Sequence, residues 1–322
     1  MATALDIFRA LADATRLRIL ALLRTMELSV GELAQVLGQS QPRVSRHVKI
    51  LVDAGLAVRR KEGSWVFVAL GDTNRTGPVL TALDQWDGAE GDHWTAADAA
   101  RLTAVRADRA AAASTWFEAH AGEWDAIRSL HVAESQVEAA MKMVLGDGPV
   151  GRLIDIGTGT GRMIELFGAR AKSAIGIDRS SEMLRLARAK LAECGRPADL
   201  RQADLYQLPM AAGSADLAIL HHVLHFAQQP AAAIAEAARV LAPSGRLLIV
   251  DFAPHQREEL RAQEAHARLG FSDEQMLGWF QAAGLAPMRI ETLAGGELTV
   301  TLWLARKTIA GTVGAVDEVK AA

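Results

Sequence analysis

The segment that most constrains the fold is residues 152–162, which read Arg-Leu-Ile-Asp-Ile-Gly-Thr-Gly-Thr-Gly-Arg. Its first half is apolar and predicts a strand, whereas Gly157, Gly159 and Gly161 precede an amphipathic helical pattern that begins at Met163. Glycines at a strand-to-helix turn let the backbone approach a ligand closely, and the amides at the helix start face that ligand. The segment therefore predicts an α/β domain with a ligand site at this turn.

A second apolar strand, residues 173–178, ends in an acid 21 positions after Gly157. This spacing suits a carboxylate, Asp178, that binds a ribose diol at the tip of the neighbouring strand. The turn is not the dinucleotide pattern G-x-G-x-x-G, because Arg162 follows Gly159 by three positions. With Asp155 two residues before the first glycine, the segment resembles motif I of class I S-adenosylmethionine (SAM) methyltransferases. The alternative is an ordinary glycine-rich turn.

Length and composition limit the remaining choices. At 322 residues and 50% hydrophobic content, the chain can form one large domain or two ordinary ones with full cores. No apolar run reaches the ~18 residues that span a bilayer, and the N-terminus lacks a signal-peptide pattern. A single cysteine, Cys194, excludes an internal disulfide framework. We therefore expect a cytoplasmic protein without a membrane partner.

Charge is distributed unevenly along the chain. Residues 1–70 contain ten Lys and Arg against six Asp and Glu, a net charge of +4. Because the whole chain carries −3, the remainder carries −7. This asymmetry suggests a basic module attached to an acidic body.

The basic segment has the pattern of several short helices. Apolar residues recur at helical spacing over 4–23 with a break near 13–15, where we expect Thr15 to cap the second helix. Ser29 and Glu32 then form a capping-box pattern for a short helix. These signals predict a small helical domain at the N-terminal side of the chain.

A further helix and a hairpin complete this domain. Ser40 and Pro42 open a helix that Gly55 ends, and residues 56–70 contain two β-prone stretches around a charged, glycine-containing turn. Two short helices around a four-residue turn, followed by a hairpin, predict a winged helix-turn-helix.

Polar side chains are expected on the outer face of the second helix, in the turn before it and on the wing. They are Gln39, Ser40, Gln41, Arg43, Ser45, Arg46, Lys49, Arg59, Arg60 and Lys61. Gln and Arg can read base edges in the major groove, whereas Ser, Lys and Arg can hold phosphates. The alternative is a merely solvated basic face. The pattern favours binding to a double-stranded DNA operator.

Residues 11–20 and 41–56 resemble the ArsR/SmtB winged-helix repressors, and the resemblance covers about residues 3–85. It implies a DNA-binding homodimer, and many members of the family release DNA on sensing a metal. Thiolate-type members carry Cys-Val-Cys where this chain has Ser29-Val30-Gly31. Because soft metals require thiolates or clustered imidazoles, we expect no metal here and another signal as the effector.

The predicted organisation is multidomain, with the boundary in the polar stretch 87–92. An α+β winged helix-turn-helix precedes a Rossmann-like class I methyltransferase domain with a mostly parallel seven-stranded sheet. The expected ranges are 1–88 for the DNA-binding domain, 89–125 for a linker or long helix, 126–307 for the SAM-binding domain and 308–322 for a disordered tail. The long helix, with an aromatic segment at 116–125, is expected to be a connector, a dimer seam or a lid over the ligand.

The resemblance to the methyltransferases implies which residues surround SAM at the carboxyl ends of the strands. They are Asp155, Gly157, Thr158, Gly159, Gly161, Asp178, Arg179, Asp204, Leu205 and His221. Asp204 ends the expected third strand, where the family contacts the adenine amino group.

Histidines and a carboxylate follow the fourth and fifth expected strands. The candidate catalytic residues are His221, His222, His225, Asp251 and His255. They suit a general base, a metal site or hydrogen-bond anchors, and each is also compatible with an ordinary structural role. The chain lacks the Asn/Asp-Pro-Pro-Tyr motif of base methylation and the Pro-Cys nucleophile of cytosine-C5 chemistry. Two possibilities remain. The domain is a small-molecule O-, N- or C-methyltransferase, or it binds SAM without catalysis.

The leading hypothesis is an ArsR-type transcriptional regulator whose second domain binds SAM or S-adenosylhomocysteine (SAH) as effector or cofactor. The alternative is an active small-molecule methyltransferase with an accessory DNA-binding or dimerisation module. A metal sensor that uses the histidine cluster is a third, weaker possibility.

Overall fold

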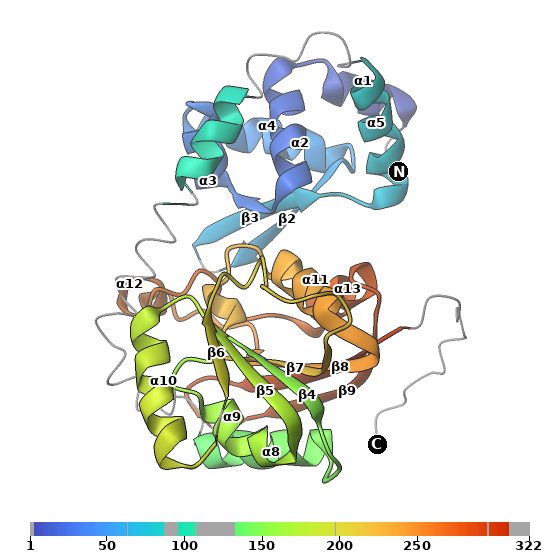
Figure 1. Ribbon diagram of the computed structural model, residues 1–322. Coiled ribbons are helices and arrows are strands. Elements are labelled where there is room, and N and C mark those ends of the chain that lie inside the picture. The colour runs from blue at the N-terminus through green and yellow to red at the C-terminus, as the bar shows by residue number, and fades with distance from the viewer. Residues whose placement is uncertain are drawn as a thin grey trace. The chain divides into compact units, whose positions relative to one another are not determined.

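The computed structural model describes residues 3–62, 64–86, 96–105, 107, 133–196, 198–294 and 296–308. The chain forms two compact units, Met1–Ala113 with Gln256–Ala265 and Ser114–His255 with His266–Ala322 (Figure 1). Residues 96–105 are helical, whereas the predicted break at 87–92, the aromatic segment at 116–125 and the tail after 308 lie outside the described residues. The predicted domain boundaries therefore stay predictions. No helix in the described part of the chain is long and apolar enough to cross a membrane.

The first unit is a set of short helices around a small antiparallel sheet. Its helices are α1 (Ala4–Leu11), α2 (Ala14–Thr25), α3 (Val30–Leu37), α4 (Gln41–Asp53) and α5 (Thr73–Trp86). Its strands β1 (Leu28–Ser29), β2 (Ala57–Glu62) and β3 (Trp65–Leu70) pair in the order β1-β3-β2. The predicted helix-turn-helix (α3 and α4) and wing (β2 and β3) are confirmed, whereas the two-residue strand β1 carries too short a pattern to be predicted.

Helix capping sets where α2 and α3 begin. The Ser29 hydroxyl accepts from the Glu32 amide at 3.2 Å and the Glu32 carboxylate accepts from the Ser29 amide at 2.6 Å, as the capping box predicts. The prediction that Thr15 caps α2 is wrong. The Asp13 carboxylate accepts from the Arg16 amide at 3.1 Å, so the helix starts at Ala14.

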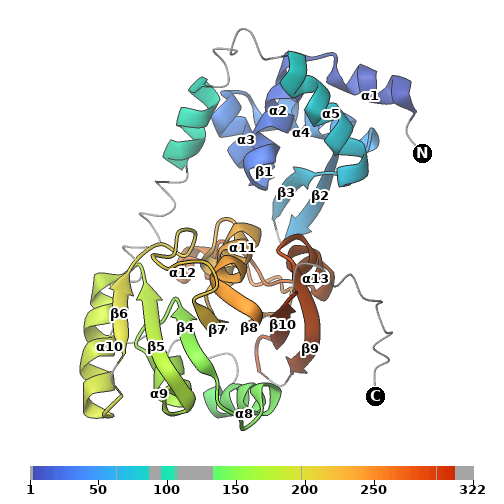
Figure 2. The same ribbon diagram turned by 45° about the vertical axis from the view of Figure 1, so that its right-hand side comes forward.

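The second unit is built on a seven-stranded sheet. Its strands are β4 (Gly151–Ile156), β5 (Ala171–Asp178), β6 (Asp199–Gln202), β7 (Ala215–His221), β8 (Leu241–Phe252), β9 (Leu285–Leu293) and β10 (Val300–Lys307). Their order is β6-β5-β4-β7-β8-β10-β9, which Figure 2 shows across the sheet. The five strands from β6 to β8 in this order pair in parallel, and β10 runs antiparallel to both β8 and β9. The prediction of a mostly parallel seven-stranded sheet is confirmed.

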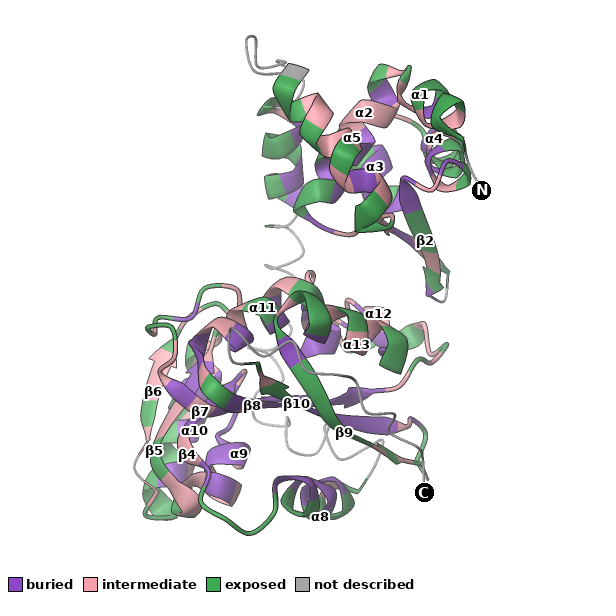
Figure 3. Cartoon of the chain, turned by 90° about the vertical axis from the view of Figure 1, so that its right-hand side faces the viewer, coloured by how far each residue is buried: buried purple, intermediate pink, exposed green. Residues whose placement is uncertain are grey.

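Helices cover both faces of this sheet. They are α8 (Glu134–Leu145), α9 (Arg162–Phe167), α10 (Ser181–Glu193), α11 (Pro230–Val240) and α13 (Asp273–Ala282), and α12 (Glu259–Gln263) lies in the stretch that groups with the first unit. Figure 3 shows α8 and α9 on one side of the sheet and α11 and α13 on the other. It also shows that β8 and β10 are largely buried, whereas β9 forms an exposed edge.

Two strand ends differ from the sequence prediction. The third strand ends at Gln202, so Asp204 lies in the loop that follows β6. The residues Ala-Pro-Ser-Gly at 242–245 predict a turn before the fifth strand. They lie within β8 instead, where Ser244 has φ +62° and Gly245 lies against the Ala242 carbonyl oxygen. Residues 242–245 therefore form an irregularity within β8, and the register between β7 and β8 shifts there.

Two neighbouring residues of α4 test the packing of the first unit. Leu51 is 0% exposed in the core and Ile50 is 41% exposed. Leu51→Ala should lower the free energy of opening around α3 and α4 by about 2–5 kcal/mol, because it removes buried methyl groups and leaves a cavity. Ile50→Ala removes a similar volume from the surface and should cost less than about 1 kcal/mol. Native-state hydrogen exchange of the full chain measures both changes, and equal costs would contradict the described packing.

Candidate functional site

The glycine-rich turn joins β4 to α9 and is held against β5. The amides of Gly157 and Thr158 both donate to the Ile177 carbonyl at 2.8 Å. Gly157 has φ +73°, and a Cβ at this position would lie 2.5 Å from a methyl group of Val223. A side chain at Gly157 is excluded both by its backbone conformation and by the close approach of the loop after β7.

The Asp178 carboxylate closes this turn. One of its oxygens accepts from the Gly159 amide and the other from the Ser180 amide, each at 2.8 Å. Burial raises the pKa of Asp178, and the amides of Ser180, Gly159 and Arg179 act in the opposite direction. The carboxylate is thus positioned by backbone alone at the tip of β5, as the spacing from Gly157 predicts, and it is able to accept hydrogen bonds from a ligand diol.

Asp155 stabilises the turn through its side chain. It is buried, and its carboxylate accepts from the Thr158 hydroxyl at 2.6 Å. The neighbouring strand approaches closely at Gly176, where a Cβ would lie 2.6 Å from a Leu200 methyl group and 2.9 Å from the Thr158 hydroxyl oxygen. Asp155 and Thr158 therefore shape the turn, and Gly161 (φ +85°) starts α9 in the left-handed conformation.

The remaining predicted SAM residues lie around this turn at the carboxyl ends of the strands. Asp204 is exposed after β6 and its carboxylate accepts from the Tyr206 amide at 3.0 Å, whereas Leu205 packs partly buried against the core. The Arg179 side chain is exposed beside Asp178. Parallel strands present their carboxyl ends at one edge, so β4, β5 and β6 bring these residues to the same edge of the sheet.

His221 ends β7 and faces a partner that the sequence did not reveal. Its Nε2 lies 3.8 Å from a carboxylate oxygen of Glu134, the first residue of α8. His221 is buried and Glu134 is nearly so. Glu134 lies 21 positions before Asp155 in a segment without a motif, and only the fold brings it to the end of β7.

Three more of the predicted catalytic residues come together in a buried cluster. His222 follows β7, His225 lies in the short helical turn Leu224–Phe226, and Asp251 lies near the end of β8. The His225 Nδ1 is 2.8 Å from an Asp251 oxygen, and the other Asp251 oxygen accepts from the His225 amide at 3.3 Å. The rings of His222 and His225 are 6.2 Å apart.

His255 and His266 form the outer part of this cluster. The His266 ring lies 4.3 Å from that of His225 and stacks on Phe252 at 5.8 Å, with 17° between the planes. The His255 ring lies 6.5 Å from that of His266. His266, on a segment between α12 and α13, therefore lies closer to the cluster than the predicted His255.

Burial dominates the electrostatics of Asp251. Its side chain is fully buried, which raises the pKa of its carboxyl group, while His222, the amides of Phe252 and His225, and His266 favour the charged form. An Asp–His pair of this geometry orients the imidazole, and it is able to move a proton or to bind a cation.

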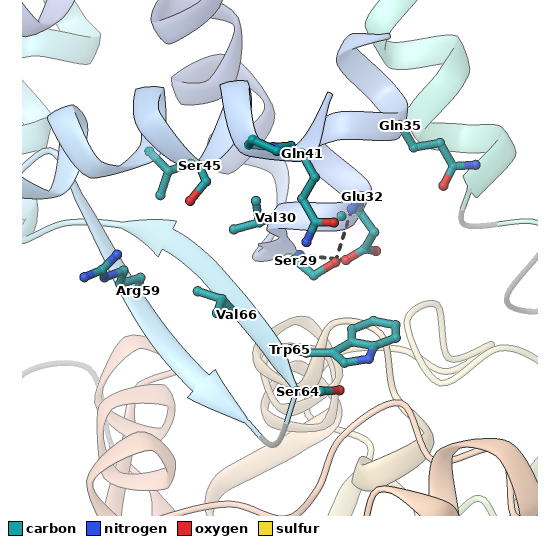
Figure 4. A pocket seen from close by; sticks show the side chains of 13 residues that line it. Ser29, Val30, Glu32, Gln35, Gln41, Ser45, Arg59, Ser64, Trp65 and Val66 are labelled. Carbon is teal, nitrogen blue, oxygen red and sulfur yellow. Dashed lines mark hydrogen bonds between the residues drawn. The ribbon is translucent and has the colours of Figure 1, made fainter. Parts of the chain in front are cut away.

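In the first unit, three of the predicted DNA contacts, Gln41, Ser45 and Arg59, line a hollow. Figure 4 shows it between α3, the start of α4 and the wing, with Gln41 and Ser45 on one side and Arg59 on another. Its volume is about 640 Å³. Most of the predicted contact side chains are exposed: Ser40, Gln41, Arg43, Ser45, Arg46, Lys49, Arg59 and Lys61.

Three of the predicted DNA contacts have partners within the protein. Arg60 pairs with Glu27 and Glu62 at 2.8 Å each, on the opposite face of β2 from Arg59. The Gln39 amide donates to the Thr15 hydroxyl at 3.1 Å, and Lys49 pairs with Asp53 at 2.6 Å on the surface of α4. Arg60 and Gln39 therefore stabilise the domain, whereas the ion pair of Lys49 is exposed and open to exchange.

Comparison with known families gives one match in each unit. Residues 13–58 match the bacterial regulatory protein, arsR family, and residues 154–249 match a methyltransferase domain. The first match covers α2 to β2, and the second covers β4 to β8 with the glycine-rich turn.

Individual relatives match one part or the other. The arsenical resistance operon repressor of Escherichia coli is 46% identical over 67 residues, 20% of this chain and 57% of that protein. The ubiquinone/menaquinone biosynthesis C-methyltransferase UbiE of Syntrophotalea carbinolica is 38% identical over 104 residues, 32% of this chain and 44% of that protein. This chain thus spans about half the length of these relatives. An HTH-type transcriptional regulator of Methanocaldococcus jannaschii is 37% identical over 83 residues, 26% of this chain and 92% of that protein.

A solved structure supports the fold of the second unit. A chain from the complex between the Haloferax volcanii Trm112 methyltransferase activator and a methyltransferase aligns with a TM-score of 0.52 at 17% identity. The alignment covers 62% of this chain and 99% of that one. At this identity the similarity concerns the fold alone.

The raised pKa of Asp178 predicts how SAM affinity depends on pH. The carboxylate form accepts hydrogen bonds from a diol, and the raised pKa means that it protonates at a higher pH than an ordinary aspartate. Affinity for SAM should therefore be constant at neutral pH and fall on acidification through this pKa. Calorimetric titrations between pH 8 and pH 5 measure this dependence. Asp178→Asn should bind at least about 10-fold more weakly and lose that part of the pH dependence, and an unchanged variant would exclude Asp178 from the site.

Proposed function

This chain belongs to the arsR family of bacterial regulatory proteins through its N-terminal domain and carries a class I methyltransferase domain on its C-terminal side, and we propose that it is a DNA-binding regulator with SAM or SAH as its effector. The observation that carries this proposal is the glycine-rich turn closed by Asp178, in a chain whose arsR-type domain has no thiolate at 29–31. The ligand site suited to sensing thus belongs to the second domain.

The first domain supports DNA binding through its exposed polar face. Gln41, Arg43 and Arg46 project from the first turns of α4, where side chains reach base edges in a major groove. Ser45 and Arg59 line the hollow beside α4 and suit phosphate contacts. The partner is a double-stranded DNA operator.

A second copy of the chain is the partner that α1 favours. Leu5 and Phe8 are 57% and 63% exposed on this helix, which is a large apolar exposure for a helix of eight residues. A homodimer would cover these side chains and would present two copies of α4 to a pseudo-palindromic site.

The effector acts through a difference in affinity. SAM or SAH changes DNA binding only as far as it binds one conformational state of the regulator more tightly than the other. SAM and SAH differ by the methyl group and its sulfonium charge, so the two ligands are able to favour different states.

The second candidate function is a small-molecule methyltransferase, and the buried His225–Asp251 pair favours it. An oriented imidazole near the carboxyl ends of β7 and β8 is positioned to remove a proton from a hydroxyl, amine or carbon acid. Relatives named for quinone and phosphatidylethanolamine methylation match the same domain. In this reading the arsR-type domain is accessory.

Arg46→Ala tests the DNA-binding part. Arg46 is exposed on α4, so its removal should weaken operator binding at least about 10-fold without unfolding the domain. A band-shift assay with the DNA upstream of its own gene measures this, and its salt dependence should become shallower by about 0.9 in log–log slope if Arg46 holds a phosphate. Arg185→Ala, an exposed arginine on α10, is the matched control. Equal binding by both variants would contradict the proposed interface.

Asp178→Asn tests whether the ligand site controls the DNA site. The variant should bind the operator like the unmodified protein, because Asp178 lies in the second unit, but its DNA affinity should no longer respond to SAM or SAH. The same band-shift assay, run with and without each ligand, shows the response. DNA affinity that is indifferent to both ligands in the unmodified protein would remove the effector proposal and favour the enzyme.

A further inference from the structure

Three side chains with metal-binding atoms converge in the interior of the second unit. One ligand atom from each of His222, His225 and Asp251 lies within 4.8 Å of the others, and all three residues are buried. Within the described part of the chain, no other group of His, Cys, Asp or Glu meets this condition with three members. The glycine-rich turn and its Asp178 belong to other strands, whereas His221, a predicted SAM contact, adjoins the cluster with its ring 4.6 Å from that of His222.

The backbone holds the three side chains in place. The His222 amide donates to the Val250 carbonyl at 2.8 Å, and His222 has φ +54°, a conformation that histidine rarely adopts. The His225 carbonyl accepts from the amides of Ala267 and Arg268 at 2.9 Å each. Residues on adjacent strands and on a third segment are thus fixed around one point, which is the preorganisation that a metal site requires.

A bound cation would balance the charge of Asp251. Asp251 is 0% exposed, and its ion-pair partner among the described residues is His225, with no lysine or arginine in an ion pair with it. A buried carboxylate beside neutral imidazoles is unfavourable unless a proton or a cation compensates it. A divalent ion would neutralise Asp251 while leaving both imidazoles neutral, the form in which they act as ligands.

We propose that His222, His225 and Asp251 bind a divalent transition-metal ion, with Zn²⁺ the best fit. Two imidazole nitrogens and one carboxylate oxygen are the donor set of many catalytic zinc sites, which keep a fourth position open. Bonds of about 2.0–2.1 Å in a tetrahedral site place ligand atoms roughly 3.4 Å apart. The His225 Nδ1 and the Asp251 oxygen, 2.8 Å apart, would have to separate by about 0.6 Å, and no other pair of ligand atoms would have to close by more than about 1.4 Å.

Neighbouring residues orient the three side chains and enclose them. The Phe252 amide donates to an Asp251 oxygen at 2.8 Å, which orients the carboxylate. The rings of Phe226 and Phe252 pack against His225 at 3.9 Å and 4.9 Å and form an apolar wall beside it. His266 lies next to His225 and provides a further imidazole near the open position.

The ligand for the open position is a hydroxyl or thiol of a small molecule. A metal-bound hydroxyl or thiol loses its proton more readily, because the cation stabilises the anion that forms. The site lies after β7 and β8, at the same carboxyl edge of the sheet as the glycine-rich turn. The inference goes beyond the proposed effector function and replaces the expectation, drawn from residues 29–31, that the chain binds no metal.

Metal analysis of the full-length protein tests this inference. Purified protein is stripped with a chelator, supplied with Zn²⁺ or Co²⁺ and dialysed, and its metal content is measured by mass spectrometry. We expect one equivalent per chain and visible d–d absorption bands with Co²⁺ that report low-coordinate nitrogen and oxygen ligands. His222→Gln and Asp251→Asn should each weaken binding at least about 10-fold. His47→Gln, a partly buried histidine on α4, is the control and should bind as the unmodified protein does.

Calorimetric SAM binding, measured on every variant, separates loss of the metal site from loss of the fold. A variant that binds SAM but not the metal supports the site. The inference is overturned if the unmodified protein binds less than about 0.1 equivalent of either metal, or if His222→Gln and Asp251→Asn variants that bind SAM retain the metal at full affinity. The metal content is measured without DNA and without a methyl acceptor. Absence of metal binding would therefore leave the effector proposal unaffected, and failure of the effector proposal would leave the metal site unaffected.

Discussion

The hydrogen bond from the Gly159 amide to the Asp178 carboxylate is the interaction on which the second domain's chemistry depends. It joins the turn after β4 to the tip of β5, and the paired amides of Gly157 and Thr158 reinforce the same junction. The glycines are required because the turn has positive φ and because Val223 approaches it closely. A partly buried carboxylate that accepts hydrogen bonds from backbone amides is held in place, so a diol-binding site at Asp178 would be preorganised.

The second constraint is that, in the proposed function, sensing and DNA reading are divided between two units. The arsR-type domain keeps the structural parts of a reader, with a capping box on α3, an exposed α4 and a wing, but has Ser29, Val30 and Gly31 where thiolates would be needed. The methyltransferase domain supplies the glycine-rich turn closed by Asp178 and a buried His–His–Asp cluster. A regulator of this kind would couple two equilibria in one chain, and the coupling free energy sets how strongly one ligand affects the other.

Local signals allowed most of the fold to be predicted, because periodicity, capping residues and the glycine turn act over a few residues. Asp178 could be paired with the turn from spacing alone. Thr15 could not be rejected as a cap, since Asp13 and Thr15 are both good cap residues and only the helix start separates them. Two contacts could not be predicted: Glu134 approaches His221, and two carboxylates pair with Arg60. They join segments that are distant in the sequence, and no local pattern encodes them.

The most direct test of the account is the reciprocity of the two binding equilibria. The dissociation constant of the unmodified protein for SAM, and separately for SAH, would be measured by calorimetry with and without saturating operator DNA. The account predicts that DNA changes the affinity for at least one of the two by the same factor by which that ligand changes the affinity for DNA, as thermodynamic linkage requires. Affinities for SAM and SAH that are identical with and without bound DNA would contradict the central claim and leave a methyltransferase with an independent DNA-binding domain.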